Sequence, residues 1–268
     1  MAMRPAAELI DTNDAKEWVT YEQPLNERMR TFLRLNFLFD QAEFHAQGSS
    51  TWQSRAAVAS LLDVLAILTR GDVRQDVIKE LERYSAGLMA FRSDPGVDRE
   101  RLNHTLDEIA IILSGLEASG NTILQELKES DFLNAVRNRS AIPGGTCEFD
   151  LPEYRHWLSL SYEKRVSDFN AWLSLLAPMR QGVSKVLWLL RESSDAERQV
   201  ARSGMYQHVL ERGVSVQLLR ISLLASHGVY PEISGNQHRF TVRFQSWQDV
   251  SSRSAQSTDD IEFKLACC

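Results

Sequence analysis

The chain has 268 residues, a formal net charge of -6 and three cysteines, and it is long enough for one large domain or two smaller ones. The acidic balance argues against a dedicated nucleic-acid binder, which normally carries a basic excess. The sequence contains no apolar run of the roughly 20 residues that a membrane span needs, and its start lacks the apolar stretch of a signal peptide. Three cysteines form no disulfide framework. We therefore expect a cytoplasmic protein.

The first part of the chain has the pattern of a helical bundle. A flexible extension is predicted for residues 1–14 and a short alternating strand for residues 16–23. Apolar residues then recur at helical spacing as far as residue 138. The expected N-terminal caps of these helices are Asn26, Ser50 or Thr51, Asp72 and Asp98.

A break interrupts the helices at the segment SAIPGGTCEFDLP, residues 140–152. Its proline and two glycines end the preceding helix, and residues 146–149 can extend as a strand. Asp150 is predicted to cap a helix that has Pro152 in its first turn. Two further helices are expected, around residues 166–176 and 180–191.

Strands dominate the last part of the chain. They are predicted at residues 205–210, 216–225, 239–247 and 261–266, with residues 251–260 as a long mobile connection. Helices first and strands last predict an α+β fold. Because the strands near Trp18 and Cys147 have no sheet of their own, we expect both to join the C-terminal strands. The domains are therefore predicted as a mainly α-helical domain (24–142 and 151–202) fused to a small, sequence-discontinuous β-domain (15–23, 143–150 and 203–268).

The strand-like run RFTVRF has the clearest functional pattern. Alternation places Phe240, Val242 and Phe244 on one face, and Arg239 and Arg243 on the other. A guanidinium group offers a planar fork of donors with a fixed charge, which suits the capture of carboxylates or of a peptide backbone. The pattern favours a binding protein over an enzyme.

Several stretches of the chain resemble the family of the bacterial cell-division protein ZapD. They are YEQPLNERMRTFLRL, SLLDVLAILTRGDVR, DPGVD, SAIPGGTCEFDLP, LLRISLLASHGVYPEISG, RFTVRF and the terminal LACC. The resemblance implies a homodimer, each subunit with a helical domain and a β-domain. It further implies that the dimer binds the C-terminal tail of the tubulin-like division protein FtsZ and bundles FtsZ filaments at midcell.

The family's tail-binding pocket is positively charged, and its basic positions match Arg34, Arg239 and Arg243 here. Two positions depart from the family pattern. Arg155 beside His156 stands where some members have a histidine, which preserves positive charge, and Asp131 stands where some have an arginine, which removes it. The expected partner-binding residues are Arg30, Arg34, Arg155, His156, Arg239 and Arg243.

The arrangement of these residues and of the dimer can also be predicted. We expect Arg34, Arg155, Arg239 and Arg243 to converge on one cleft between the helical and β parts. Broad apolar stripes on the second and third helices, at Trp52 to Leu68 and Val73 to Phe91, predict a dimer held mainly by the helical domain. Arg70, Asp72 and Arg74, at the turn between those helices, are the expected polar rim of the dimer.

Each group of basic residues also has a plainer interpretation. Arg239 and Arg243 can be a solvated sheet face, and Arg30 and Arg34 can simply pair with Glu27. Arg155 and His156 can decorate the surface of a short helix. A DNA-binding accessory protein that uses the same arginine face is an alternative function.

A second alternative function is a cysteine-dependent enzyme that uses Cys147, because Asp150 and His156 lie close to it in sequence. A nucleophile needs a base within reach, however, and a strand more often buries such a cysteine as a small apolar residue. Cys267 and Cys268 would point to opposite sides of a strand, so they are poor joint metal ligands. We expect no catalytic residue, metal, cofactor or small-molecule substrate.

Overall fold

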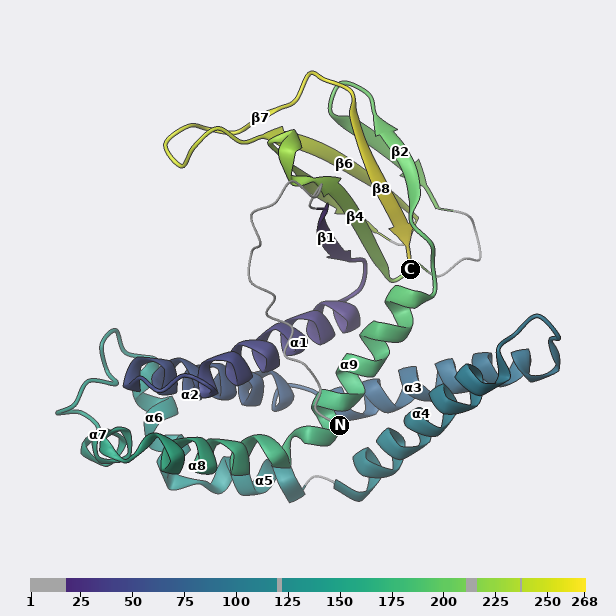
Figure 1. Cartoon of the computed structure of the whole chain (residues 1–268). Coiled ribbons are helices and arrows are strands. Elements are labelled where there is room, and N and C mark those ends of the chain that lie inside the picture. The colour runs from purple at the N-terminus through teal and green to yellow at the C-terminus, as the bar shows by residue number, and fades with distance from the viewer. Residues whose placement is uncertain (1–17, 120–121, 211–215, 237) are drawn as a thin grey trace. The chain divides into compact units, whose positions relative to one another are not determined.

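Figure 1 shows the computed structural model, which describes residues 18–119, 122–210, 216–236 and 238–268. The predicted extension, residues 1–14, lies outside this range. The chain divides into two compact units. Residues Glu27–Ser193 form a helical unit, and the described residues up to Asn26 join those from Ser194 to Cys268 in a strand unit. The predicted α+β class is confirmed.

Several helices of the helical unit begin at side chains that favour helix starts. The helix bounds are α1 (Glu27–Ala46), α2 (Thr51–Leu68), α3 (Val73–Ala90), η1 (Phe91–Ser93), α4 (Arg99–Ser119), α5 (Thr122–Glu129), α6 (Asp131–Ser140), α7 (Pro152–Ser159), α8 (Tyr162–Leu175) and α9 (Ala177–Glu192). The side-chain oxygens of Ser50, Asp72 and Asp98 accept hydrogen bonds from first-turn N–H groups, as predicted.

Helix α9 lies among three other helices of the unit. It contacts α1, α3 and α4, while α1 also packs along α2 and α3 along α4. Val77 and Leu81 of α3 are fully buried, but Phe91, at the end of the predicted stripe, is 52% exposed. Trp52, which was predicted on the apolar stripe of α2, is 78% exposed. The stripes therefore supply a core over part of their length and leave large apolar side chains on the surface.

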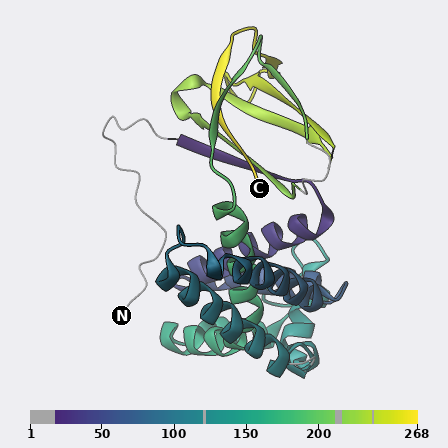
Figure 2. The same cartoon turned by 90° about the vertical axis from the view of Figure 1, so that its right-hand side faces the viewer.

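Two antiparallel sheets form the strand unit (Figures 1 and 2). Their strands are β1 (Trp18–Pro24), β2 (Glu197–Ala201), β3 (Met205–Val209), β4 (Leu218–Leu224), β5 (Val229–Gly235), β6 (Arg239–Ser246), β7 (Ala255–Gln256) and β8 (Ile261–Cys267). One sheet has the order β1-β4-β8-β2; the other has the order β3-β6-β5, with β7 also paired to β6. The predicted union of the first strand with the C-terminal strands is confirmed, since β1 pairs with β4.

The core of the strand unit lies between the inner faces of these sheets. Ile221 and Phe263 come from the first sheet, and Phe240, Val242 and Phe244 from the second; all are at most 2% exposed. The rings of Phe244 and Phe263 lie with their centroids 5.1 Å apart. This packing fixes which face of β6 is turned outward.

The predicted strand at residues 146–149 is wrong. Residues 141–150 form consecutive turns inside the helical unit. The N–H groups of Gly145 and Cys147 bond to the carbonyls of Ile142 and Gly144, so these donors are satisfied locally. Gly144 has a φ of 72°, which a glycine adopts without strain. The segment therefore does not belong to the β-domain.

Other predictions near the element ends also need correction. Leu151, without a side-chain bond, occupies the N-cap of α7, the position predicted for Asp150. Residues 197–201, which were placed in the helical domain, form β2 and pair with β8. Strand β5 was missed, and the short β7 lies within the predicted connection 251–260.

Candidate functional site

Two arginines of β6 point away from the core of the strand unit. Phe240, Val242 and Phe244 are buried, whereas Arg239 and Arg243 are exposed, in the alternation that the sequence predicted. Residues two apart on a strand share a face. The guanidinium groups therefore project from a strand whose other face is locked into the core.

Neighbouring strands extend this face on both sides, because cross-strand partners share a face. The β6 arginine face is defined here as Arg239, Thr241 and Arg243 with their partners Met205, Gln207 and Val209 on β3 and Glu232 and Ser234 on β5. The carboxylate of Glu232, opposite Arg243, accepts a hydrogen bond from Gln245 Nε2 at 3.0 Å. Within the described residues, neither Arg239 nor Arg243 has an ion pair.

The basic residues predicted in the helical unit differ in their partners. Arg30 of α1 lies 3.5 Å from Glu27, and Arg155 of α7 lies 3.1 Å from Glu148. Arg34 is exposed and, in the part of the chain that the structure describes, has no ion pair. Exposed pairs contribute about 0–1 kcal/mol, so Arg30 and Arg155 can exchange their partners readily. His156 is also exposed. Their partner-binding role stays a prediction.

The two arginines predicted at the dimer rim have different surroundings. Arg74 Nη1 donates to the carbonyl oxygen of Leu116 at 3.1 Å, so it holds the C-terminal part of α4 against α3. Arg70 is exposed on the connection between α2 and α3. A role for either residue in a dimer stays a prediction.

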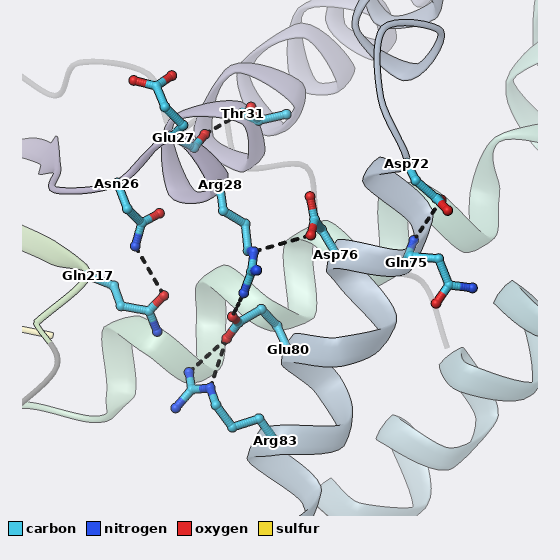
Figure 3. Close-up of polar contacts among 10 residues, drawn as sticks. All are labelled: Asn26, Glu27, Arg28, Thr31, Asp72, Gln75, Asp76, Glu80, Arg83 and Gln217. Atoms are coloured by element: carbon cyan, nitrogen blue, oxygen red, sulfur yellow. Dashed lines mark hydrogen bonds and ion pairs between the residues drawn. The ribbon is translucent and has the colours of Figure 1, made fainter.

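A charged network that the sequence did not suggest joins α1 to α3 (Figure 3). Arg28 Nη1 donates to the carboxylate of Glu80, and Arg28 Nε lies 3.4 Å from Asp76. Arg83 Nε also donates to Glu80, at 3.0 Å. The side chain of Glu80 is only 4% exposed. The network holds the helix that carries Arg30 and Arg34.

We expect Glu80→Gln to destabilise the helical unit by about 1–2 kcal/mol. The amide keeps the shape of the side chain but removes a nearly buried charge that receives charge-assisted contacts from Arg28 and Arg83. The loss stays in the lower range because Arg28 and Arg83 are 39% and 53% exposed and water can solvate them. Urea unfolding followed by far-UV circular dichroism measures the change. Asp76→Asn, at a carboxylate that is 42% exposed, is the matched control; equal losses would contradict the importance of the buried acid.

Arg55 anchors the turn segment that precedes α7. Its Nη1 donates to the carbonyl oxygen of Thr146 at 2.8 Å, and its guanidinium lies 5.1 Å from the ring centroid of Tyr154. Burial raises the pKa of the Tyr154 hydroxyl to about 12, although the nearby Arg55 charge acts to lower it. The hydroxyl therefore stays protonated in the physiological range and is not suited to proton transfer there.

Cys147 has a carboxylate as its neighbour. Its Sγ donates to Asp150 Oδ2 at 3.4 Å, and Asp150 lies 3.7 Å from Arg139. A reactive cysteine commonly has a lysine, arginine or histidine beside its sulfur, whereas the hydrogen-bond partner of Cys147 is an acidic side chain. This geometry gives no support to thiol catalysis.

The described part of the chain contains neither a cluster of metal ligands nor a helix that could span a membrane. Over residues 18–119, 122–210, 216–236 and 238–268, His, Cys, Asp and Glu side chains form no group of three or more that could hold a metal ion. Over the same ranges, every helix is too short or too polar to span a bilayer.

Comparison with known proteins gives one consistent result. Residues 33–243 match the family model ZapD, described as a cell division protein. A protein of Methylococcus capsulatus named Cell division protein ZapD is 38% identical over 94% of this chain and 99% of its own length. Proteins of the same name from Aromatoleum aromaticum and Klebsiella pneumoniae are each 38% identical, over 95% and 93% of this chain and 98% of their own lengths.

Proposed function

Because the chain belongs to the ZapD family of cell division proteins, we propose that it is a non-enzymatic dimer that binds the C-terminal tail of FtsZ and crosslinks FtsZ filaments. The observation that carries this proposal is the β6 arginine face. Arg239 and Arg243 are exposed, form no ion pair among the described residues and project from a strand fixed by its buried side. Such forks can receive the carboxylates and backbone carbonyls of an extended tail.

The mechanism that we propose is bivalency. A homodimer carries two copies of each surface, and two tails bound to one dimer can belong to different filaments. Once one tail is held, the second meets its site at a high effective concentration, so weak individual sites can still bundle filaments. The protein would act in the cytoplasm and gather at the midcell division ring.

Co-sedimentation of FtsZ filaments with the purified protein tests the proposal. Bundles should pellet at low speed with intact FtsZ and fail to form with FtsZ that lacks its C-terminal tail. A tail peptide added in excess should dissolve existing bundles. Bundling that persists without the tail would contradict the proposal, and tighter binding to duplex DNA than to the tail peptide at the same salt would favour the nucleic-acid alternative.

The dimer itself yields a separate prediction. The helical unit exposes large apolar side chains, among them Trp52 at 78% and Ile111 at 70%. We expect some of them to lie in the dimer interface, because contact between subunits would remove their apolar surface from water. We expect sedimentation velocity at micromolar concentration to give twice the 30.5 kDa mass of the chain. Trp52→Glu should shift the species toward monomer, whereas Trp247→Glu in the strand unit, at a side chain 53% exposed, should not. A monomeric wild type would refute this prediction.

A further inference from the structure

A cavity in the helical unit brings together basic side chains from three separate elements. Its volume is about 460 Å³. Arg70 follows α2, Arg74 lies in the first turn of α3, and Lys128 lies near the end of α5. Pockets of 300–1,000 Å³ are typical of small-molecule sites. A bound ligand of opposite charge would explain why three basic residues line one cavity of this size.

The charges of this cavity are not balanced within the described chain. Arg70 and Lys128 have no ion pair there. The acid in the lining, Asp72, caps α3 by accepting a hydrogen bond from Gln75 N at 3.2 Å. The lining thus contains one carboxylate and three basic side chains. The cavity carries a local positive charge in a chain whose net charge is negative.

Arg74 has a donor that is left over. Its Nη1 bonds to the carbonyl oxygen of Leu116, while its Nε is buried and has no hydrogen-bond partner. Buried polar groups are nearly always paired. Because this Nε has almost no exposed surface, an acceptor in the cavity reaches it only after the Arg74 side chain shifts.

Apolar side chains form the rest of the wall, including Leu124, Leu175 and Pro178. The lining therefore combines a cationic part with an apolar part. A single carboxylate occupies one arginine fork, whereas a phosphate monoester carries a charge of about -1.5 to -2 and three strong acceptor oxygens. We propose that this cavity binds a small molecule that carries a phosphate group beside an apolar or ring moiety. This site is independent of the proposed binding of the FtsZ tail.

Phenyl phosphate, which has both chemical features, is the probe that tests the proposal. Isothermal titration calorimetry of the full chain, at constant ionic strength set with chloride, should show saturable binding of one molecule per subunit. Lys128→Gln and Arg70→Gln should each weaken binding about tenfold, the loss typical of one charge-assisted contact. Benzoate, with a planar carboxylate, should bind more weakly than phenyl phosphate. Arg74 is left unchanged because it also holds the carbonyl of Leu116.

Arg92→Gln supplies the matched control, since Arg92 is exposed on η1 and lies outside the lining of the cavity. Its affinity for phenyl phosphate should equal that of the wild type. If Arg92→Gln loses as much affinity as the cavity variants do, the loss reflects the overall charge of the protein, and the proposal is overturned. If binding of phenyl phosphate does not saturate at millimolar concentration, the proposal is also overturned. The same holds if Arg70→Gln and Lys128→Gln lose the dimer but bind phenyl phosphate as the wild type does. Titration with the FtsZ tail peptide in parallel separates this result from the proposed function.

Discussion

Arg239→Glu and Arg243→Glu are each expected to weaken binding of the FtsZ tail by about 10- to 150-fold and to stop bundling, while the strand unit remains folded. A charge-assisted contact is worth about 1.5–3 kcal/mol, and glutamate replaces attraction by repulsion. Both side chains are exposed and their neighbours Phe240, Val242 and Phe244 form the core, so folding should not depend on them. Titration of each variant with a fluorescent tail peptide measures the change.

Arg198→Glu is the control for these charge reversals. Arg198 is also an exposed arginine of the strand unit, but it lies on β2 in the other sheet. Its variant changes the net charge by the same amount and should bind the tail as the wild type does. Binding should also weaken as salt rises, because the screening length is only about 8 Å at physiological ionic strength. Wild-type affinity in both β6 variants would show that these arginines are merely a solvated sheet face.

The outward face of β6 could be predicted because it depends on a local rule. Period-two alternation in RFTVRF sets which side chains share a face, and three large apolar residues decide which face is buried. The helix starts at Ser50, Asp72 and Asp98 were equally local, since a capping side chain bonds to N–H groups two or three residues away.

The missed strands lie where that local rule is weakest. Strands β2 and β5 each lie at the end of the strand order of their sheet. Strand β2 has the polar sequence ERQVA, and only Ala201 is buried. Strand β5 contains Pro231, which a strand at the edge of a sheet tolerates because one side needs no ladder hydrogen bonds. Neither segment shows the apolar alternation by which a strand is recognised.

Contacts between distant segments could not be predicted from pattern at all. Arg28 and Glu80 are 52 residues apart, and their pairing requires α1 to lie along α3. The segment around Cys147 was predicted as a strand but forms turns. Its backbone N–H groups bond to nearby carbonyls instead of to a neighbouring strand, and the sequence alone does not show which of these two sets of hydrogen bonds forms. That the helical arginines and the arginines of β6 share one surface stays a prediction, since it depends on the arrangement of two separate units.

A buried arginine that sequence reasoning passed over leads to the largest expected effect on folding. Arg165 of α8 is 6% exposed. Its guanidinium donates to Ser54 Oγ at 3.0 Å and to the carbonyl oxygens of Leu158 at 3.3 Å, Leu160 at 2.6 Å and Ser49 at 2.6 Å. It thereby joins the end of α7 to the start of α2. Since α7 carries Arg155 and His156, the bond set also fixes two predicted partner-binding residues.

Arg165→Met is expected to destabilise the helical unit by about 3 kcal/mol or more. Methionine retains much of the apolar volume but removes the donor to four oxygens. Two of them, Ser54 Oγ and the carbonyl oxygen of Leu158, are buried, and each unsatisfied buried group costs about 1–3 kcal/mol. Urea unfolding followed by far-UV circular dichroism measures the loss. Arg139→Met removes an exposed arginine that lies 3.7 Å from Asp150, and this control should change stability by less than about 1 kcal/mol.

If the end of α7 positions part of the tail site, Arg165→Met should also lower affinity for the tail peptide under conditions where the variant is still folded. Amide hydrogen exchange should then show faster opening of α7 with unchanged protection in the strands, because the broken bonds all lie in the helical unit. Unchanged stability would mean that water or a neighbouring donor replaces the guanidinium, and that Arg165 does not fix α7.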